Sequence, residues 1–198
     1  MGMIEWLLEK PRRDYFDRVY EEKATSQARY NTASSTDKRT DVTIMNLRVG
    51  DYVTFKGIDY YVRQRYLYRA GSFEWLAYQF SDSARQNYLW LDVEDDDELS
   101  IEMSEPLKLP PEISVDVLKA KQPVTINGER FEYDEHGYAQ VRIEKENKRW
   151  DSDTVEYWDY YTRDESKYIS CEKWGDDELE ASYGYPIKEF ELDIYPGS

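Results

Sequence analysis

Short runs of alternating apolar and polar residues, separated by turn residues, follow one another along most of the chain after residue 41. Alternation with a period of two places successive side chains on opposite faces of a β-strand. Runs of this length with regular turns are typical of a sandwich or a small barrel, so we predict a mainly β fold. In the first half the pattern predicts strands over Val53–Phe55, Asp59–Arg69, Phe73–Phe80, Tyr88–Val93 and Glu98–Ser104.

The alternating pattern occurs twice. The stretch VTFKGIDYYV (53–62) corresponds to VTINGERFEY (124–133). In each copy a Gly follows Lys56 or Asn127 between apolar residues. This predicts a tight hairpin turn, since glycine takes positive φ without steric cost.

The correspondence continues downstream, where FEWLAYQFSD matches VEYWDYYTRD and YLWLDVEDDDEL matches YISCEKWGDDEL. We therefore predict a tandem duplication of one antiparallel β-meander, with repeat one over 41–107 and repeat two over 113–195, arranged as a sandwich or as small barrels. Overlaying the copies pairs residues that are apolar in both and should point into the core: Leu76/Trp158, Tyr78/Tyr160, Leu91/Cys171 and Leu99/Leu179.

Residues 1–40 form an arm outside the repeats. Its apolar spacing predicts a short N-terminal helix over about residues 12–23, and the small polar residues of 24–40 predict a linker. A helix of this length is marginal alone in water, so its apolar face must be covered by the protein's own sheets, a second subunit or a membrane surface. We expect the arm to recruit a partner through Ile4, Trp6, Leu7, Leu8, Tyr15 and Phe16.

The charge of the chain is acidic and unevenly distributed. The formal net charge is -16, and residues 1–40 carry 8 basic against 7 acidic residues, so the acidic excess belongs to the repeats. Such a body repels phosphate backbones, so we expect no nucleic-acid partner and take solubility as the simplest reason for the charge. A single Cys, no secretory signal and no long apolar run lead us to expect a cytoplasmic protein.

Candidate catalytic and metal-binding groups are few. Cys171 matches Leu91 and is expected to be a small buried residue, and His136 is expected at an exposed turn. One His and one Cys are too few for the usual zinc sites. The acidic runs Asp92–Glu98 and 175–178 lack the spacing of a calcium loop, so we expect hairpin tips, with a weak divalent-cation site as the less favoured alternative. We expect no enzyme activity, no metal and no cofactor.

Aromatic residues are frequent, with 19 Tyr and 6 Trp. Two small cores cannot hold all of these large side chains, and the ones left over include Trp75, Tyr157 and Trp174. Tyr and Trp outside a core often mark protein interfaces. We expect these three side chains on an exposed face, where they either bind a protein partner or cover the second face of the sheets.

A series of spaced motifs carries a family resemblance: Leu47-x-Val49-Gly50-Asp51-x-Val53, Tyr60-x-Val62, Glu74-Trp75-x-x-Tyr78 and Tyr88-Leu89-x-Leu91, then Tyr168-Ile169-Ser170-x-Glu172-x-Trp174 and Gly184-x-Pro186-Ile187. Over about 41–195 these motifs resemble the bacterial domain of unknown function 4178. The resemblance implies no established activity. Because relatives tend to be encoded beside membrane-stress proteins of the phage-shock type, it implies an accessory role at the inner membrane.

Two functions stay open. The first is a non-enzymatic adaptor, peripheral to the inner membrane, that presents its aromatic and acidic sheets to a protein partner or to a second copy of itself. The alternative is a β-barrel that holds a small cationic or apolar ligand, for which the acidity makes a polyamine one candidate. A closed cavity lined by Tyr and Glu would favour the ligand binder, whereas a filled core with a flat aromatic face would favour the adaptor.

Overall fold

The computed structural model describes residues 41–82, 88–95, 98–146, 150–175 and 178–197. The arm over 1–40, with its predicted helix, lies outside the described residues. The elements are β1 (Tyr52–Phe55), β2 (Ile58–Ala70), β3 (Phe73–Asp82), β4 (Tyr88–Asp95), β5 (Leu99–Pro106), α2 (Val115–Lys119), β6 (Val124–Ile126), β7 (Glu129–Lys145), β8 (Trp150–Tyr161), β9 (Tyr168–Trp174), β10 (Glu178–Pro186), η2 (Glu189–Glu191) and β11 (Leu192–Tyr195).

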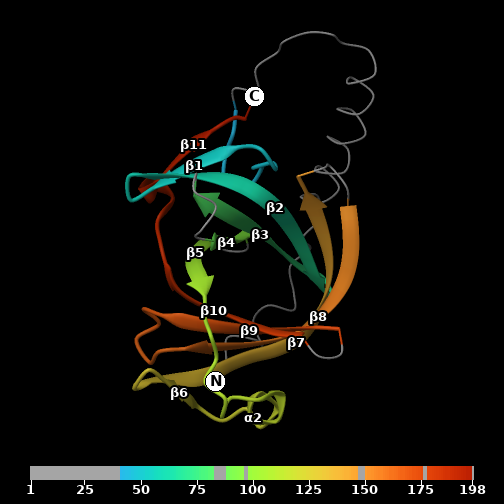
Figure 1. The fold of residues 1–198 in the computed structure, drawn as a ribbon, viewed down its shortest axis with the longest axis vertical. Coiled ribbons are helices and arrows are strands. Elements are labelled where there is room, and N and C mark those ends of the chain that lie inside the picture. Colours follow the sequence, from blue (N-terminus) through green and yellow to red (C-terminus); the bar gives the residue numbers. More distant parts are fainter. Residues whose placement is uncertain (1–40, 83–87, 96–97, 147–149, 176–177, 198) are drawn as a thin grey trace. The chain divides into compact units, whose positions relative to one another are not determined.

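The predicted β fold is confirmed, and its strands close into a ring (Figure 1). The eleven strands among the described residues form one sheet in the order β11-β1-β2-β3-β4-β5-β10-β9-β8-β7-β6. An additional antiparallel pairing joins β2 to β7, from Gln64 opposite Lys145 to Arg69 opposite Gln140. The eight strands from β2 round to β7 therefore make a closed ring without a free edge, and the short strands β1, β11 and β6 extend it outside the ring.

Each half of the chain forms a five-stranded meander, β1–β5 and β6–β10, and contributes four of its strands to the ring. The two predicted hairpin turns are present: φ is 50° at Lys56 and 52° at Asn127, each followed by a glycine with positive φ. Bulges in β2 and β7 begin at Val62 and Tyr133, which are 71 residues apart, the same offset as between the hairpins. The superposition of the two repeats stays a prediction.

The strands of the second half bury their outer face as well as their inner one. Trp158 and Tyr160 of β8 and Cys171 of β9 pack outside the ring, where they are covered by Leu118 of α2 and by Phe131 at the start of β7. The prediction that these residues are buried is correct, but their core lies outside the ring. Leu99, predicted to be in the core, is 42% exposed because it begins β5 beside the turn of the β4–β5 hairpin, where it pairs with Asp95.

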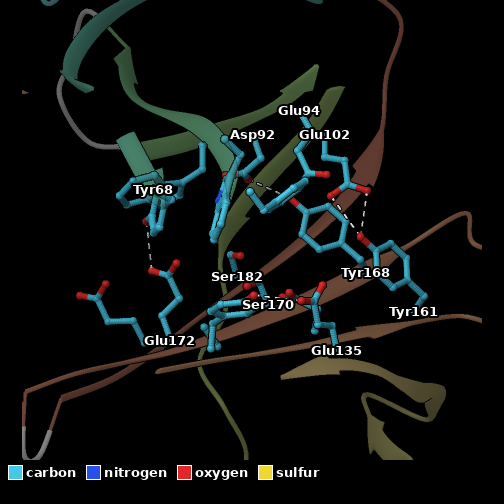
Figure 2. Close-up of a pocket in the computed structure, with 17 residues that line it drawn as sticks. Tyr68, Asp92, Glu94, Glu102, Glu135, Tyr161, Tyr168, Ser170, Glu172 and Ser182 are labelled. Atoms are coloured by element: carbon cyan, nitrogen blue, oxygen red, sulfur yellow. Dashed lines mark hydrogen bonds between the residues drawn. The ribbon is translucent and has the colours of Figure 1, made fainter. Parts of the chain in front are cut away.

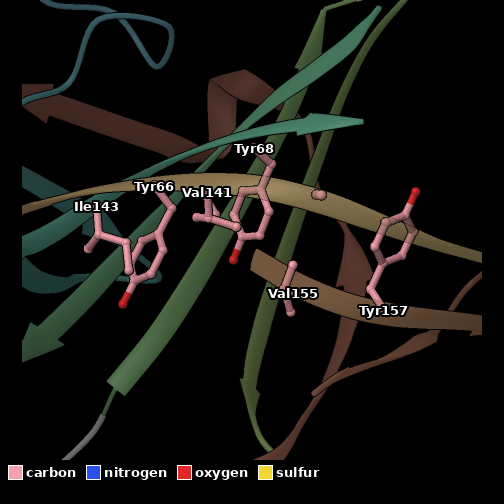
Figure 3. Close-up of a cluster of buried hydrophobic side chains, with 8 residues drawn as sticks. Tyr66, Tyr68, Val141, Ile143, Val155 and Tyr157 are labelled. Atoms are coloured by element: carbon pink, nitrogen blue, oxygen red, sulfur yellow. The ribbon is translucent and has the colours of Figure 1, made fainter. Parts of the chain in front are cut away.

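A second apolar cluster lies inside the ring at the seam where β2 meets β7 (Figure 3). Tyr66 and Tyr68 of β2 pack there against Val141 of β7 and Val155 of β8. These residues fill part of the interior and hold the seam closed. Aromatic and acidic residues line the cavity in the rest of the interior.

Two local expectations are changed by the strands. His136 does not lie at an exposed turn: it sits within β7, half-buried, with its ring stacked on that of Trp158 at 5.2 Å. Residues 115–119, which the sequence did not indicate as helical, form α2. No helix in the described part of the chain is long and apolar enough to span a membrane.

Candidate ligand site

A cavity of about 110 Å³ lies inside the ring, several times the space that one water molecule needs. Each of the eight ring strands contributes at least one side chain to its lining. Seven of the lining residues are aromatic and seven are acidic. The aromatic residues are Tyr68, Phe73, Trp75, Trp90, Tyr157, Tyr161 and Tyr168, and the acidic ones are Asp92, Glu94, Glu102, Glu135, Asp159, Glu172 and Glu180.

The charge of this lining has one sign. Among the described residues that border the cavity, none is Lys, Arg or His. Figure 2 shows the carboxylates approaching from two opposing walls, with Asp92, Glu94 and Glu102 on one side and Glu135 and Glu172 on the other. The cavity is therefore a concentrated source of negative potential enclosed by aromatic rings.

The carboxylate of Glu172 is held in place by two donors from different parts of the ring. Tyr68 Oη of β2 donates to Glu172 Oε2 at 3.5 Å, and Trp174 Nε1 of β9 donates to the same atom at 3.1 Å. Both donors act on one oxygen. They fix the carboxylate in one orientation facing the cavity.

Tyrosine hydroxyls hold the carboxylates of the opposite wall in the same way. Tyr168 Oη donates to Asp92 Oδ2 at 3.2 Å, and Tyr161 Oη lies 3.3 Å from Glu102 Oε1. Asp92 and Glu102 are directly paired across β4 and β5, so two like charges face each other on one side of the sheet. Such a pair destabilises a sheet unless a cation or a proton neutralises it.

A second like-charge pair joins β7 and β8. Glu135 and Asp159 are opposite each other in the register, and both border the cavity. Tyr157 Oη donates to Glu135 Oε1 at 2.9 Å, and Ser170 forms a hydrogen bond with Asp159. These neutral donors orient the carboxylates but do not balance their charge.

Removal from bulk water shifts the protonation of four of these groups. Burial raises the pKa of Asp92 to about 7, and burial together with the charges of Asp92, Glu94 and Asp159 raises the pKa of Glu102 to about 8. Burial is also the main cause that raises the pKa values of Asp159 and Glu172 to about 8. Without a bound cation these carboxyls would exchange protons near neutral pH, and a bound cation would favour their ionised forms.

Two glycines make room for the tyrosines of the lining. Gly137 lies opposite Tyr157, and Gly184 lies opposite Tyr168. A Cβ atom on Gly137 would lie 2.5 Å from Tyr157 Oη, and one on Gly184 would lie 2.5 Å from Tyr168 Cε1. Both rings therefore lie over bare backbone, which leaves the space in front of them open.

The aromatic residues predicted to face a partner occupy the interior instead. Trp75 and Tyr157 line the cavity, and Trp174 packs on the inner apolar cluster. Their predicted exposure is wrong, because closure of the ring through β2 and β7 encloses the face on which they lie. Their role in binding a protein partner is not decided by this placement. Ile4, Trp6, Leu7, Leu8, Tyr15 and Phe16 lie outside the described residues.

The groups singled out for chemistry lie on the outer face of the ring. Cys171 is 1% exposed, and burial raises its thiol pKa to about 12. His136 Nε2 lies 3.0 Å from Glu156 Oε1, which also accepts a hydrogen bond from Tyr138 Oη at 2.7 Å. Burial disfavours ionisation of Glu156, but these hydrogen bonds and nearby Lys119 lower its pKa. Neither the thiol nor the imidazole borders the cavity.

Sequence reasoning missed the carboxylates of the cavity, since it assigned the acidic residues to solvent. A signal was present in β8, where Tyr157, Asp159 and Tyr161 alternate on one face with Trp158 and Tyr160 on the other. A strand with large aromatic residues on both faces is buried on both, so its central Asp must face an enclosed space. The run Asp92–Glu98 likewise contains the cavity residues Asp92 and Glu94 as well as part of a hairpin tip.

Comparison with known proteins returned one family and no individual relative. A family model described as Domain of unknown function (DUF4178) matches residues 48–189, which is more than half of the chain and includes all eight strands of the ring. Neither the curated proteins nor the solved structures contain a match to the chain.

Proposed function

The chain belongs to the family of the domain of unknown function DUF4178, whose description states no activity, and we propose that the chain binds a small organic cation inside its ring of strands. The single observation that supports this proposal most is the lining of the cavity, with seven carboxylates and no basic residue among those described. The proposal concerns binding and not catalysis.

The electrostatics of the cavity favour a cation. Enclosed carboxylates lose their hydration, and like charges in register repel each other. A bound cation removes both penalties at once, because it supplies opposite charge and hydrogen-bond donors to groups that are already oriented. The free energy of binding therefore includes the relief of strain that the unliganded protein carries.

The aromatic rings favour an organic cation over a bare ion. Cations bind over the faces of Trp and Tyr, and the gain is largest where water is excluded. Trp75 and Trp90 supply such faces next to the carboxylates. No group of three or more His, Cys, Asp or Glu side chains among the described residues converges closely enough to hold a metal ion. An ammonium group needs no such convergence.

The arrangement bears on the two functions that the sequence left open. A cavity lined by Tyr and Glu inside the ring is the feature expected of a ligand binder, and the aromatic residues expected on an adaptor surface line or border the interior. We therefore place the ligand binder ahead of the adaptor. Recruitment of a protein partner by the arm over 1–40 is a separate proposal on which the cavity has no bearing.

Thermal unfolding in the presence of small cations tests the proposal. A ligand that binds only the folded state raises the midpoint with its concentration. At about pH 8 and constant ionic strength, alkylammonium salts should raise the midpoint of the full chain, and the matched neutral alcohols and sodium chloride should not.

A pair of variants controls for non-specific attraction to an acidic protein. Asp159→Asn removes a carboxylate of the cavity, whereas Glu105→Gln removes an exposed one from β5. The rise of the thermal midpoint with alkylammonium should be smaller in Asp159→Asn and unchanged in Glu105→Gln. Equal shifts in both variants, or no shift in the wild type, would show that the cavity is not a cation site.

A further inference from the structure

We infer that the cation of this cavity is a linear di- or polyammonium compound, which places separate ammonium groups at opposing walls of the ring and lays its carbon chain along the aromatic faces between them. The inference rests on the proposed function and names the class of its ligand.

The distribution of the carboxylates is the first argument. One pair, Asp92 and Glu102, lies on β4 and β5, and a second, Glu135 and Asp159, lies on β7 and β8. These strands belong to opposite halves of the chain, and Figure 2 shows Asp92 and Glu102 entering the cavity from one side and Glu135 from the other. Glu172 on β9, held by Tyr68 and Trp174, forms a third anionic point. A molecule with two or more ammonium groups can place one of them at each of these points.

The charge to be balanced is the second argument. Each in-register pair carries up to two negative charges, and a single monovalent cation leaves most of that charge uncompensated. The described residues contain no cluster in which three acidic, His or Cys side chains surround one point, so a single divalent ion would not satisfy the groups either. Positive charge delivered at several points along one molecule matches the arrangement.

The hydrogen-bonding capacity of the walls is the third argument. Each carboxylate named above accepts from a neutral side chain on one side and keeps further lone pairs for the ligand. Primary ammonium groups supply three donors each, whereas a quaternary ammonium supplies none. The walls therefore favour ligands with N–H groups.

The space between the anionic points suits methylene groups. Trp75 and Trp90 border the cavity from neighbouring strands, and Tyr68 stacks on Trp75 with ring centroids 4.9 Å apart. Apolar surface removed from water along these rings adds to affinity in proportion to its area. A chain of a few methylenes between the charged ends would contact these rings.

Calorimetric titration of the full chain separates the ligand classes. The probes are butylamine, 1,4-diaminobutane, a linear triamine, tetramethylammonium and Mg²⁺, at about pH 8 and constant ionic strength. The diamine should bind at least about tenfold more tightly than butylamine, and the triamine at least as tightly as the diamine. Asp92→Asn and Glu135→Gln, one from each wall, should each reduce the affinity for the diamine more than the affinity for butylamine. Glu105→Gln should leave the affinities for all probes unchanged.

The outcomes distinguish this inference from the proposed function. If butylamine binds as tightly as the diamine, the inference is wrong and the cation site stands. If tetramethylammonium or Mg²⁺ binds more tightly than the diamine, the ligand class is wrong. If no organic cation binds, the proposed function fails. Circular dichroism checks that each variant is folded. If Asp92→Asn does not fold, Glu102→Gln replaces it as the probe of the same wall.

Discussion

Replacing Glu172 by Gln should make the folded protein more stable at mildly alkaline pH. In the wild type, ionisation of Glu172 is opposed mainly by burial and further by the charge of Asp92, and its pKa is raised to about 8. Gln has nearly the same shape and still offers an oxygen to the Tyr68 hydroxyl and the Trp174 indole, which donate to Glu172 in the wild type. The substitution therefore removes the charge and keeps the local hydrogen bonds.

The sign of the effect follows from proton linkage. A carboxyl whose pKa is higher in the folded state binds its proton more tightly there than in the unfolded chain. Its contribution to the free energy of unfolding then falls as pH rises from the unfolded pKa to the folded one, here from 4.5 to about 8. Within that window one such group contributes a slope of about 1.4 kcal/mol per pH unit. Above the folded pKa the carboxyl is ionised in both states, so the slope vanishes.

The magnitude for Glu172 is about 2 kcal/mol between about pH 6 and pH 8, because the slope weakens as the pH nears the folded pKa. Chemical denaturation of both proteins over this range gives the two free-energy curves. The variant and the wild type should be similar at the acidic end, and the variant should become more stable by this order of magnitude at the alkaline end. Glu105→Gln, on the exposed surface, is the matched control and should run parallel to the wild type.

Parallel curves for Glu172→Gln and the wild type over this range would refute the reasoning. They would mean that Glu172 is already ionised in the folded protein, so that burial in the ring does not raise its pKa. If the curve of the variant is parallel but lower, the ionised carboxylate in addition stabilises the fold.

Three further predictions concern other parts of the chain. Gly184→Ala should cost about 1–3 kcal/mol through overpacking, since its Cβ would collide with the Tyr168 ring, and denaturant unfolding measures this cost. Cys171→Ala should cost on the order of 1 kcal/mol, and the native thiol should react with an alkylating reagent much more slowly than the unfolded one, because Cys171 is buried and its pKa is raised. Deleting residues 1–23 should leave the thermal midpoint of the ring nearly unchanged while abolishing co-purification of a protein partner; a midpoint many degrees lower would show that the arm belongs to the core.

Local features of the fold could be predicted from the sequence because short-range physics decides them. The turns at Lys56-Gly57 and Asn127-Gly128 need two successive residues with positive φ, and the sequence supplies a glycine at the second position of each. Alternation likewise indicated which residues share a face, and Trp158, Tyr160 and Cys171 are buried together as expected.

Closure of the ring could not be predicted in this way. Period-two alternation assigns side chains to the two faces of a strand, but it does not determine which face lines the interior of the ring. The pairing of β2 with β7 joins Leu67 to Arg142, residues far apart in the sequence with no local signal for their contact. Because apolar residues were assumed to mark the inside, the acidic face was assigned to solvent. The candidate site lies on that face, so the same assumption hid both the closure and the site.

The position of the acidic residues argues against solubility as their sole purpose. Acids on an outer surface keep a protein soluble at little cost to folding, but Asp92, Glu102, Asp159 and Glu172 border an interior cavity, where burial raises their pKa values to about 7 or 8. They lower stability as they ionise and contribute little to the outer surface. Sequences usually agree with their fold at every level except where function requires otherwise. A cation bound between the walls would turn this repulsion into attraction, so the carboxylates that weaken the fold without a cation are the groups that would bind one.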